Sequence, residues 1–409
     1  MRDLIPSEEE RFFNLFKEYY DLEKSVSAQH DPANYTLDRM KPLAEAAGHP
    51  ETRLKIIHIA GTKGKGSTSH FISALLQAAG HSVGLFTSPH LATVRERFQL
   101  NNQLIPYELL IDASTAFIAE LRHRNLTPSL FEIFTVLAMK IFVDMNMEYA
   151  VMETGIGGLL DATNYVPAAD CCAITPVSFD HVALLGNTIE AIAAQKAGII
   201  KPNTPVVIAK QPYAAAEKVI IDRAAAVNAP VIRPAALADC TDFIQPTWPP
   251  FLKENFQTAL AALHVLGFNP LPADFRMPQL RARCEAIRQN PLVLLDAAHN
   301  ADSMAHLVQS VKVLYPNVRF TVVLASVQGK DIHGIVRELA KLDADIILTN
   351  PHTPRTSALP QLIRVCADER LHVTQVIPDL HSPAQLPKDT PLIFTGSFFT
   401  AVIGESFYN

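Results

Sequence analysis

The chain has 409 residues, which is long enough for two or three domains with proper hydrophobic cores. Its formal charge of -6, from 35 basic and 41 acidic side chains, provides no global attraction to nucleic acid or anionic lipid, so any anion must be bound locally. The opening MRDLIPSEEERFF lacks the apolar core of a signal peptide, and no apolar run approaches the ~20 residues that span a bilayer. We therefore expect a cytoplasmic protein without nucleic acid or membrane partners. The five cysteines, an odd number without metal-ligand spacing, are expected to be free thiols.

The first predicted element is an amphipathic helix over residues 8–26. Aromatic side chains recur along it at helical spacing, among them Phe12, Phe16 and Tyr19. Such a stripe usually packs into the core, and we favour that interpretation over a contact with a ligand. Phe131 and Phe134, in a later predicted helix, are interpreted in the same way.

Apolar, β-rich runs then alternate repeatedly with helical patterns. This alternation predicts a parallel sheet with helices on both faces, and therefore an α/β fold. The expected strands are 55–60, 82–87, 149–153, 171–175 and 205–209. The expected helices are 67–80, 107–122, 130–145 and 188–197.

The stretch HIAGTKGKGS, at residues 58–67, joins the first expected strand of this set to a helix. Gly61, Gly64 and Gly66 allow backbone amides to face a common centre, and the following helix turns its positive end toward an anion. Lys65 adds a point charge for the β and γ phosphates of a nucleotide. Because Gly-x-x-Gly-Lys lies here between a strand and a helix, we favour a phosphate-binding loop over a structural turn without a ligand.

Three further charged positions follow predicted strands or lie near a helix end. Glu153 opens the run ETGIGGLLDATN, and a carboxylate at the carboxyl end of a parallel strand lies where such sheets bind ligands. Mg²⁺ takes few protein oxygens beside phosphates, so Glu153 is a candidate metal ligand, with the capping of a turn as the alternative. His181, after Asp180, and Lys196 would each be structural if they stood alone. Beside a phosphate loop they become candidates for placing charge around a transferring phosphoryl group.

A second set of strands follows a proline-rich, irregular region at 240–280 that contains one expected helix, 254–266. We predict a large domain over residues 1–280, a linker at 281–290 and a smaller α/β domain over 291–409. The strands expected in the second set are 292–296, 319–325, 345–349, 373–377 and 391–394.

An ordered series of motifs resembles the folylpolyglutamate synthase and dihydrofolate synthase family of the Mur ligase superfamily. The motifs, in chain order, are GTKGKGS, TSPHL, ERF, SLFEIFT, ETGIGG, LDATN, DHVALLGNT, QKAGIIKP, DAAHN and TGSFF. The similarity runs from about residue 10 to 405. It implies a phosphate-loop-containing large domain of Mur ligase type and a smaller Rossmann-like α/β domain. It also implies an ATP-dependent amide ligase that phosphorylates a folate or dihydropteroate carboxylate, after which L-glutamate attacks the acyl phosphate.

The resemblance also implies roles for individual residues toward ATP and magnesium. Ser88 and Glu153 would bind one Mg²⁺, while His181 and Glu153 would help to hold a second. Lys196 matches a lysine that is carbamylated in this family, which converts a cation into an anion able to ligate magnesium. The implied ATP-binding positions are Gly61, Thr62, Lys63, Gly64, Lys65, Gly66, Ser67, Asn255, Arg283 and Asp296.

The incoming glutamate is associated by resemblance with His299 and Ser397. Since the donors come from both domains, domain closure is expected to assemble the site and exclude water from the acyl phosphate. The resemblance also favours a monomer. The catalytic positions that it implies are Lys65, Glu153, His181, Lys196 and His299.

The sequence departs from the family pattern at several places. Lys63 stands for asparagine, Leu159 for arginine, and Phe251-Leu252 for a frequent His-Gln pair. Arg281-Ala282-Arg283 stands for Pro-Gly-Arg. Gln195 stands for glutamate and Ala297 for glycine. These changes leave the ATP motifs largely intact, so we expect any difference to concern the acceptor pocket.

Two alternatives to the folate ligase remain open at this point. One is a Mur-type ligase that joins another acid or another amino acid. The other is a nucleotide-binding paralogue without ligase activity, which is disfavoured because the implied catalytic and metal positions are all present. Dihydrofolate synthase, polyglutamate synthase and a bifunctional enzyme share these motifs, so the sequence does not separate them.

Overall fold

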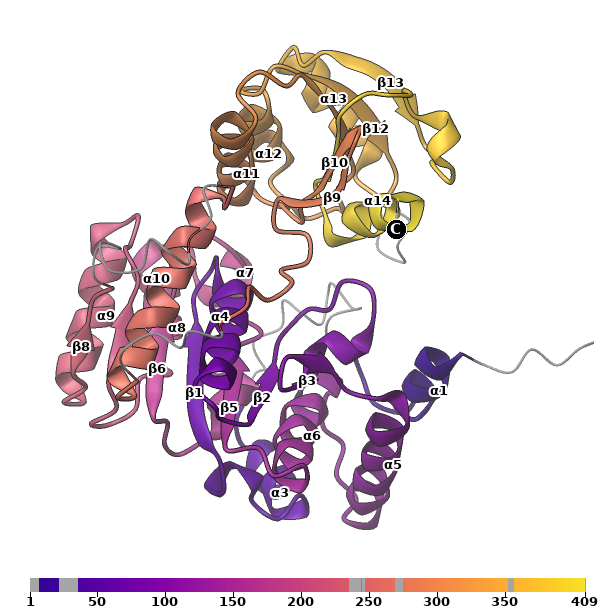
Figure 1. Cartoon of the computed structure of the whole chain (residues 1–409). Helices are drawn as coiled ribbons and strands as arrows, with labels where there is room; N and C mark the ends of the chain where they lie inside the picture. The colour runs from indigo at the N-terminus through magenta and orange to yellow at the C-terminus, as the bar shows by residue number, and fades with distance from the viewer. Residues whose placement is uncertain are drawn as a thin grey trace, which may run out of the picture. The chain divides into compact units, whose positions relative to one another are not determined.

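The computed structural model describes residues 7–21, 36–234, 244, 247–268, 275–351 and 357–408. The chain divides into two compact units, each built around its own sheet (Figure 1). The first unit comprises Met1–Thr241 and Glu254–Pro278, and the second comprises Asp242–Lys253 and Gln279–Asn409. Cys171, Cys172, Cys284 and Cys366 are free and buried, as expected, whereas Cys240 lies outside the described residues.

The first unit contains an eight-stranded sheet in the order β4-β3-β2-β5-β1-β6-β7-β8. In this spatial order the six strands β2, β5, β1, β6, β7 and β8 pair in parallel, as the alternating pattern predicted. Parallel neighbours need such crossover connections. The antiparallel edge formed by β3 and β4 was not predicted. The strands are β1 Lys55–Ala60, β2 Val83–Phe86, β3 Phe98–Leu100, β4 Gln103–Leu104, β5 Tyr149–Glu153, β6 Cys171–Ile174, β7 Val206–Ile208 and β8 Val231–Ile232.

Helices flank this sheet close to the positions expected from the sequence. Ile56, Phe86 and Met152 belong to the same buried cluster as the apolar side of α6. Phe71 of α4 lies 5.2 Å from Phe256 of α10, between ring centroids. No helix among the described residues has both the length and the apolar character needed to cross a membrane. The helices of this part of the chain are α1 Glu8–Asn14, α3 Met40–Ala46, α4 Lys65–Ala78, α5 Tyr107–His123, α6 Leu130–Asp144, α7 Val182–Leu185, α8 Ile189–Ala197, α9 Ala214–Ala226 and α10 Pro250–Val265.

The N-terminal helix is shorter than predicted. It begins after the capping residue Ser7 and ends at Asn14, and the chain then continues in turns with i to i+3 hydrogen bonds through Tyr19. Aromatic residues are weak helix formers, and tertiary packing decides where such a helix stops. Phe12 and Phe16 pack against Phe134 in the core, which confirms the structural interpretation of the aromatic stripe. Residues 22–26 of the predicted helix lie outside the described residues.

The second unit contains a six-stranded sheet in the order β13-β12-β11-β14-β10-β9. All neighbouring strands are parallel except β9, which pairs antiparallel with β10. The strands are β9 Glu285–Gln289, β10 Leu292–Leu295, β11 Phe320–Leu324, β12 Ala344–Thr349, β13 Val373–Ile377 and β14 Leu392–Thr395. The helices are α11 Ala301–Leu314, α12 Ile332–Leu339, α13 Leu359–Asp368 and α14 Phe398–Tyr408.

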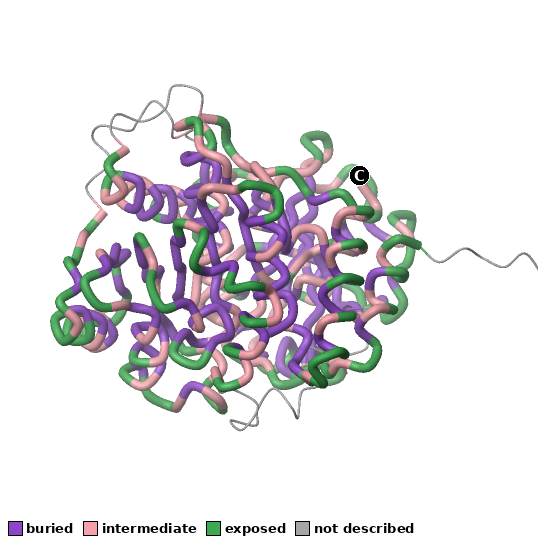
Figure 2. Tube along the Cα trace, turned by 90° about the horizontal axis from the view of Figure 1, so that it is seen from below, coloured by how far each residue is buried: buried purple, intermediate pink, exposed green. Residues whose placement is uncertain are grey.

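The stretch expected to be a linker is not wholly irregular. Residues 285–289 form β9, so half of the expected linker at 281–290 is an edge strand of the second sheet. The sequence hid this strand because three of its five residues, Glu285, Arg288 and Gln289, are charged or polar and leave no apolar run, as is usual at a sheet edge. Central strands of both sheets are buried, β5 and β11 throughout, and Figure 2 shows such buried stretches of the chain beside exposed ones.

Candidate active site

The first sheet brings four predicted site segments to one edge. Strands β2, β5, β1 and β6 are consecutive neighbours and run in parallel, so their carboxyl ends lie together. Ser88 follows β2, Glu153 ends β5, the glycine loop follows β1, and His181 follows β6. Ligands bind at this edge of open α/β sheets. The topology therefore gathers residues as far apart in the chain as Gly61 and His181.

The phosphate loop connects β1 to α4 through a backbone that requires glycine. Gly64 has φ of 80°, and a Cβ at this position would lie 2.9 Å from Cγ of Asn255. A Cβ on Gly61 would collide with the side chain of Thr175. Helix α4 begins at Lys65 without any side-chain cap, so its first N–H groups remain oriented for an anion. The loop is further fixed by Thr62, whose N–H donates to the carbonyl of Pro176 at 2.9 Å.

Replacement of Gly64 by alanine is expected to destabilise the protein by about 2–3 kcal/mol, because it adds backbone strain and displaces the Asn255 amide. Gly80 is a matched control, since its φ is 90° but no atom lies within 4 Å of the place that a Cβ would occupy. Gly80→Ala should therefore cost only the backbone term, about 1–2 kcal/mol. Urea unfolding of both variants measures the difference. Equal losses would show that the contact with Asn255 does not constrain the loop.

The carboxylate of Glu153 lies beside this loop. Its side chain is 4% exposed, and its Oε2 accepts a hydrogen bond from the backbone N–H of Ser88 at 3.1 Å. The same oxygen lies 3.4 Å from the position that a Cβ on Gly66 would occupy. A carboxylate and a hydroxyl next to a phosphate loop fit the oxygen donors that Mg²⁺ prefers. Within the described part of the chain, no three His, Cys, Asp or Glu side chains form a metal-binding group by themselves.

Lys196 reaches the same loop from helix α8. Its ammonium donates to the carbonyl of Gly61 at 2.9 Å, and the residue is 4% exposed. Burial, together with the positive charge of Lys65, lowers the pKa of Lys196 to about 7, while the charge of Asp180 acts in the opposite direction. A substantial fraction of this amine is therefore uncharged at neutral pH, which is the form that reacts as a nucleophile.

The ETGIGG loop packs directly against the part of α8 that carries Lys196. A Cβ on Gly158 would lie 2.9 Å from the Lys196 carbonyl, and the N–H of Leu159 donates to the Gln195 carbonyl at 2.6 Å. Leu159, which replaces the family arginine, is 43% exposed, and the covered part of its side chain lies beside Gly198. Close approach to α8 therefore explains the glycine at position 158, whereas a Cβ on Gly155 would meet the ring of Phe131.

Asp180 and His181 follow β6, and His181 begins helix α7 with φ of 49°. The backbone N–H of His181 is bonded to Oδ1 of Asp180 at 3.0 Å.

Asn255, on α10, is 5% exposed and presents its amide to Gly64. Phe251, by contrast, belongs to the second unit and contacts His306 at 6.0 Å between ring centroids.

The remaining predicted residues lie in the second unit. Asp296 follows β10 and is 6% exposed. Its carboxylate accepts hydrogen bonds from the N–H groups of Cys284 and Ala298, both at 2.8 Å. His299 Nδ1 lies 2.9 Å from the carbonyl of Ala297. One aspartate thus orders both the turn before β9 and the turn that carries His299.

Ser397 precedes α14 and accepts a hydrogen bond from the N–H of Thr400 at 3.1 Å. Phe398, the next residue, is a feature that the sequence interpretation did not single out. The Arg283 guanidinium lies 5.5 Å from its ring centroid, and the His299 ring lies 6.0 Å from it. Phe398 is part of the TGSFF motif, which was the available sequence signal. Its neighbours Arg283 and His299 lie about 100 residues earlier in the chain, so its contacts could not be inferred from the motif.

Each unit matches a domain of the Mur ligases. Residues 59–232 match the Mur ligase middle domain, and residues 282–387 match the Mur ligase glutamate ligase domain. Together with the phosphate loop and its neighbouring carboxylate, these matches define an ATP-dependent ligase of the Mur type.

Curated relatives and solved structures narrow this class. The dihydrofolate synthase/folylpolyglutamate synthase of Bacillus subtilis is 33% identical over 364 residues, which cover 80% of this chain and 83% of the relative. A bifunctional folylpolyglutamate synthase/dihydrofolate synthase from Yersinia pestis, complexed with AMPPNP and Mn ion, is 27% identical with a TM-score of 0.81 and 98% coverage of both chains. A further structure of such a bifunctional enzyme, with Mn, AMPPNP and L-glutamate bound, is 27% identical with a TM-score of 0.78, covering 91% of this chain and 94% of that chain. The chain belongs to the folylpolyglutamate synthase/dihydrofolate synthase family.

Proposed function

We propose that this protein joins L-glutamate to the carboxylate of a folate or of dihydropteroate, at the expense of ATP. The observation that carries the proposal is the meeting of Lys65, Glu153 and the buried Lys196 around one phosphate loop at the carboxyl edge of the first sheet. Family membership supplies the substrate class, since the named relatives are folylpolyglutamate and dihydrofolate synthases.

In the first step, the substrate carboxylate attacks the γ-phosphorus of ATP, the bond to the β-phosphate oxygen breaks, and ADP leaves. The products are an acyl phosphate and ADP. Residues 61–67 hold the triphosphate through backbone N–H groups, and Lys65 balances the charge on the transferring group. The protein contributes mainly position and charge, because the phosphoryl transition state needs little covalent assistance.

In the second step, the uncharged amine of glutamate attacks the acyl carbon. The tetrahedral intermediate collapses to an amide and inorganic phosphate, and the amine loses a proton. We assign His299 and Ser397 to glutamate, in keeping with a related structure that holds L-glutamate. Phosphate is a far better leaving group than carboxylate oxygen, so ATP makes an otherwise unfavourable condensation accessible.

We assign magnesium to Ser88, Glu153 and His181, because a hydroxyl and a carboxylate beside phosphates are oxygen donors that it accepts. Bound there, it would neutralise charge on the phosphate oxygens. We further propose that Lys196 is carbamylated. Its buried amine would attack CO₂, forming an N–C bond and releasing a proton, and the resulting carbamate would add an anionic oxygen ligand. The low exposure of Lys196 and its hydrogen bond to the Gly61 carbonyl support this proposal.

The deciding experiment measures phosphate release from ATP and magnesium at constant L-glutamate. Dihydropteroate, tetrahydrofolate and a blank without either are compared. Release with dihydropteroate alone would assign a dihydrofolate synthase, release with tetrahydrofolate alone a polyglutamate synthase, and release with both a bifunctional enzyme. No release with either, by protein that binds ATP, would refute the proposal. We further propose that the protein is a cytoplasmic monomer. Light scattering of the same sample measures its molar mass and so tests whether it is a monomer.

His181→Ala should lower kcat by about 100-fold, because a group that helps to hold the metal acts mainly in the transition state. The Kd for the pterin acid should stay within about twofold, since uniform substrate binding does not depend on this side chain. Single-turnover assays and equilibrium binding measure the two effects. His123→Ala, at an exposed position of α5, is the control and should change neither. A collapse of pterin binding with kcat retained would assign His181 to the acceptor pocket.

A further inference from the structure

The turn at residues 281–284, here called the arginine turn, holds a backbone conformation that side chains disfavour. Ala282 has φ of 50° and Cys284 has φ of 52°, so two non-glycine residues adopt the left-handed region on either side of Arg283. In this region Cβ approaches the following carbonyl oxygen. Such a conformation persists only where surrounding contacts over-determine it.

Hydrogen bonds from the second unit fix this backbone on both sides of Arg283. The N–H of Ala282 donates to Oε2 of Glu285 at 2.8 Å. The carbonyl of Ala282 accepts from the N–H of Ala297 at 3.0 Å. The N–H of Cys284 donates to Oδ2 of Asp296 at 2.8 Å. Both left-handed residues are therefore held by a carboxylate of the same unit.

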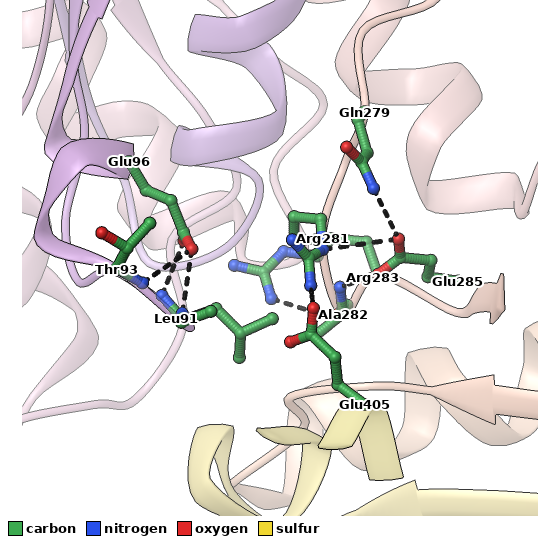
Figure 3. A network of polar contacts seen from close by, with 10 residues as sticks. Leu91, Thr93, Glu96, Gln279, Arg281, Ala282, Arg283, Glu285 and Glu405 are labelled. Atoms are coloured by element: carbon green, nitrogen blue, oxygen red, sulfur yellow. Dashed lines mark hydrogen bonds and ion pairs between the residues drawn. The ribbon is translucent and has the colours of Figure 1, made fainter. Parts of the chain in front are cut away.

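Arg281 links the turn to helix α14 (Figure 3). Its guanidinium donates to Glu405, and its Nε lies 3.6 Å from Oε1 of Glu285. Glu285 thus attracts Arg281 with one oxygen while its other oxygen accepts from the Ala282 N–H. The side chains of Arg281, Glu285 and Glu405 are only 15–24% exposed, so water screens these pairs less than it screens surface pairs. A separate set of bonds in Figure 3 holds Glu96 to the N–H groups of Leu91 and Thr93 in the first unit.

Arg283 meets the same helix at a second point. Its guanidinium lies 5.5 Å from the ring centroid of Phe398. Phe398 and Glu405 are seven residues apart in α14, which is two helical turns, so they lie on one side of the helix. Alternate residues of the arginine turn therefore contact one side of α14. One of the N–H groups of Arg283 donates to the Ala282 carbonyl at 3.1 Å, which ties the guanidinium to the strained residue.

We propose that Arg281 is a positioning residue that, through Glu405 and Glu285, holds Ala282 in the left-handed conformation and thereby orients Arg283 toward its anionic ligand. The inference rests on the proposed function and on the role toward ATP that the family resemblance implies for Arg283. Alanine at position 282 makes this support necessary, because glycine would adopt the same backbone without the steric penalty. Loss of the ion pairs allows the turn to relax, which displaces Arg283.

The test is a cycle of four full-length proteins: wild type, Arg281→Met, Ala282→Gly and the double variant. Arg281→Met should lower kcat/KM for ATP on the order of tenfold, because small displacements of a substrate-binding group cost that much or more. Ala282→Gly alone should stay within about twofold of wild type. The double variant should recover most of the loss, since glycine removes the drive to relax. KM for glutamate should remain within about twofold throughout.

A matched control is Arg319→Met, which removes an arginine that pairs with Asp343 and Asp345 elsewhere in the second unit. This variant should leave kcat/KM within about twofold of wild type, because exposed ion pairs contribute little. Unchanged activity in Arg281→Met, or a double variant as slow as Arg281→Met, would overturn the positioning role.

Urea unfolding of the same four proteins provides a readout that needs no ligase activity. The stability gained by Ala282→Gly should be smaller in the Arg281→Met background, since a relaxed turn no longer contains the strain that glycine relieves. Additive stability changes would contradict the inference even if the enzyme proved inactive on pterin acids. Absence of wild-type turnover with a non-additive cycle would refute the proposed function and retain the structural coupling.

Discussion

Lys65→Ala is expected to lower ligase turnover by about 1,000-fold or more while the fold remains intact. Lys65 is the first residue of α4 and follows the glycine loop, so its charge is available to the β and γ phosphates of ATP. Loss of one preorganised charge at a phosphoryl group typically costs two to three orders of magnitude. Phosphate release under saturating ATP measures the loss, and circular dichroism tests the fold.

The control for this variant is Lys218→Ala on α9, where the lysine is 75% exposed and pairs with Asp222. Its removal should leave turnover unchanged, because an exposed pair four residues apart contributes little. Near-normal turnover of Lys65→Ala would show that the loop does not bind the triphosphate as proposed.

The second large effect concerns Lys196. If its amine is carbamylated, removal of CO₂ and bicarbonate should lower turnover at least about tenfold, and added bicarbonate should restore it. Lys196→Met should lose about 1,000-fold and show no response to bicarbonate, because the variant has no amine to modify. Lys201→Met is a matched control, since burial also lowers the pKa of Lys201. Its bicarbonate response should persist. Full activity of the wild type in CO₂-free buffer would refute the carbamate.

The unmodified lysine also makes a pH-dependent contribution to stability. Its pKa falls from 10.5, the ordinary value for a solvated lysine, to about 7 in the folded chain. Between these values the unfolded state binds a proton that the folded state does not, so the contribution becomes more favourable as pH rises. Below pH 7 both states are protonated and the slope disappears. In CO₂-free urea titrations between pH 7.5 and 9, wild type should gain up to about 1.4 kcal/mol per pH unit over Lys196→Met. A constant difference would contradict the assigned ionisation.

The alternation of strands and helices could be predicted because it depends on local hydrophobic periodicity. The residues at which helices and strands begin and end could not be predicted in this way. Helix α1 stops at Asn14 although its aromatic pattern continues, since packing of Phe12 and Phe16 against Phe134 sets its length. Strand β9 was hidden in the expected linker because an edge strand needs few buried side chains.

The candidate site divides in the same way. The glycine loop and Glu153 could be assigned from sequence, since each lies at a recognisable strand end. The hydrogen bond from Lys196 to the Gly61 carbonyl could not be predicted. The two residues are 135 positions apart and meet only when α8 packs beside the loop. The role of Asp296 toward ATP stays a prediction, and its hydrogen bonds to two backbone N–H groups could not be predicted from the sequence.

The sequence by itself determined the α/β class, the alternation of buried strands with helices and the chemical character of the phosphate loop, because each depends on neighbouring residues. Tertiary structure decided which lysine is buried beside that loop and which carboxylates hold the arginine turn. Burial, charge and hydrogen bonding between distant residues depend on the packed strands and helices. No local pattern encodes the contact between Arg281 and Glu405, since it exists only after α14 has folded against its sheet.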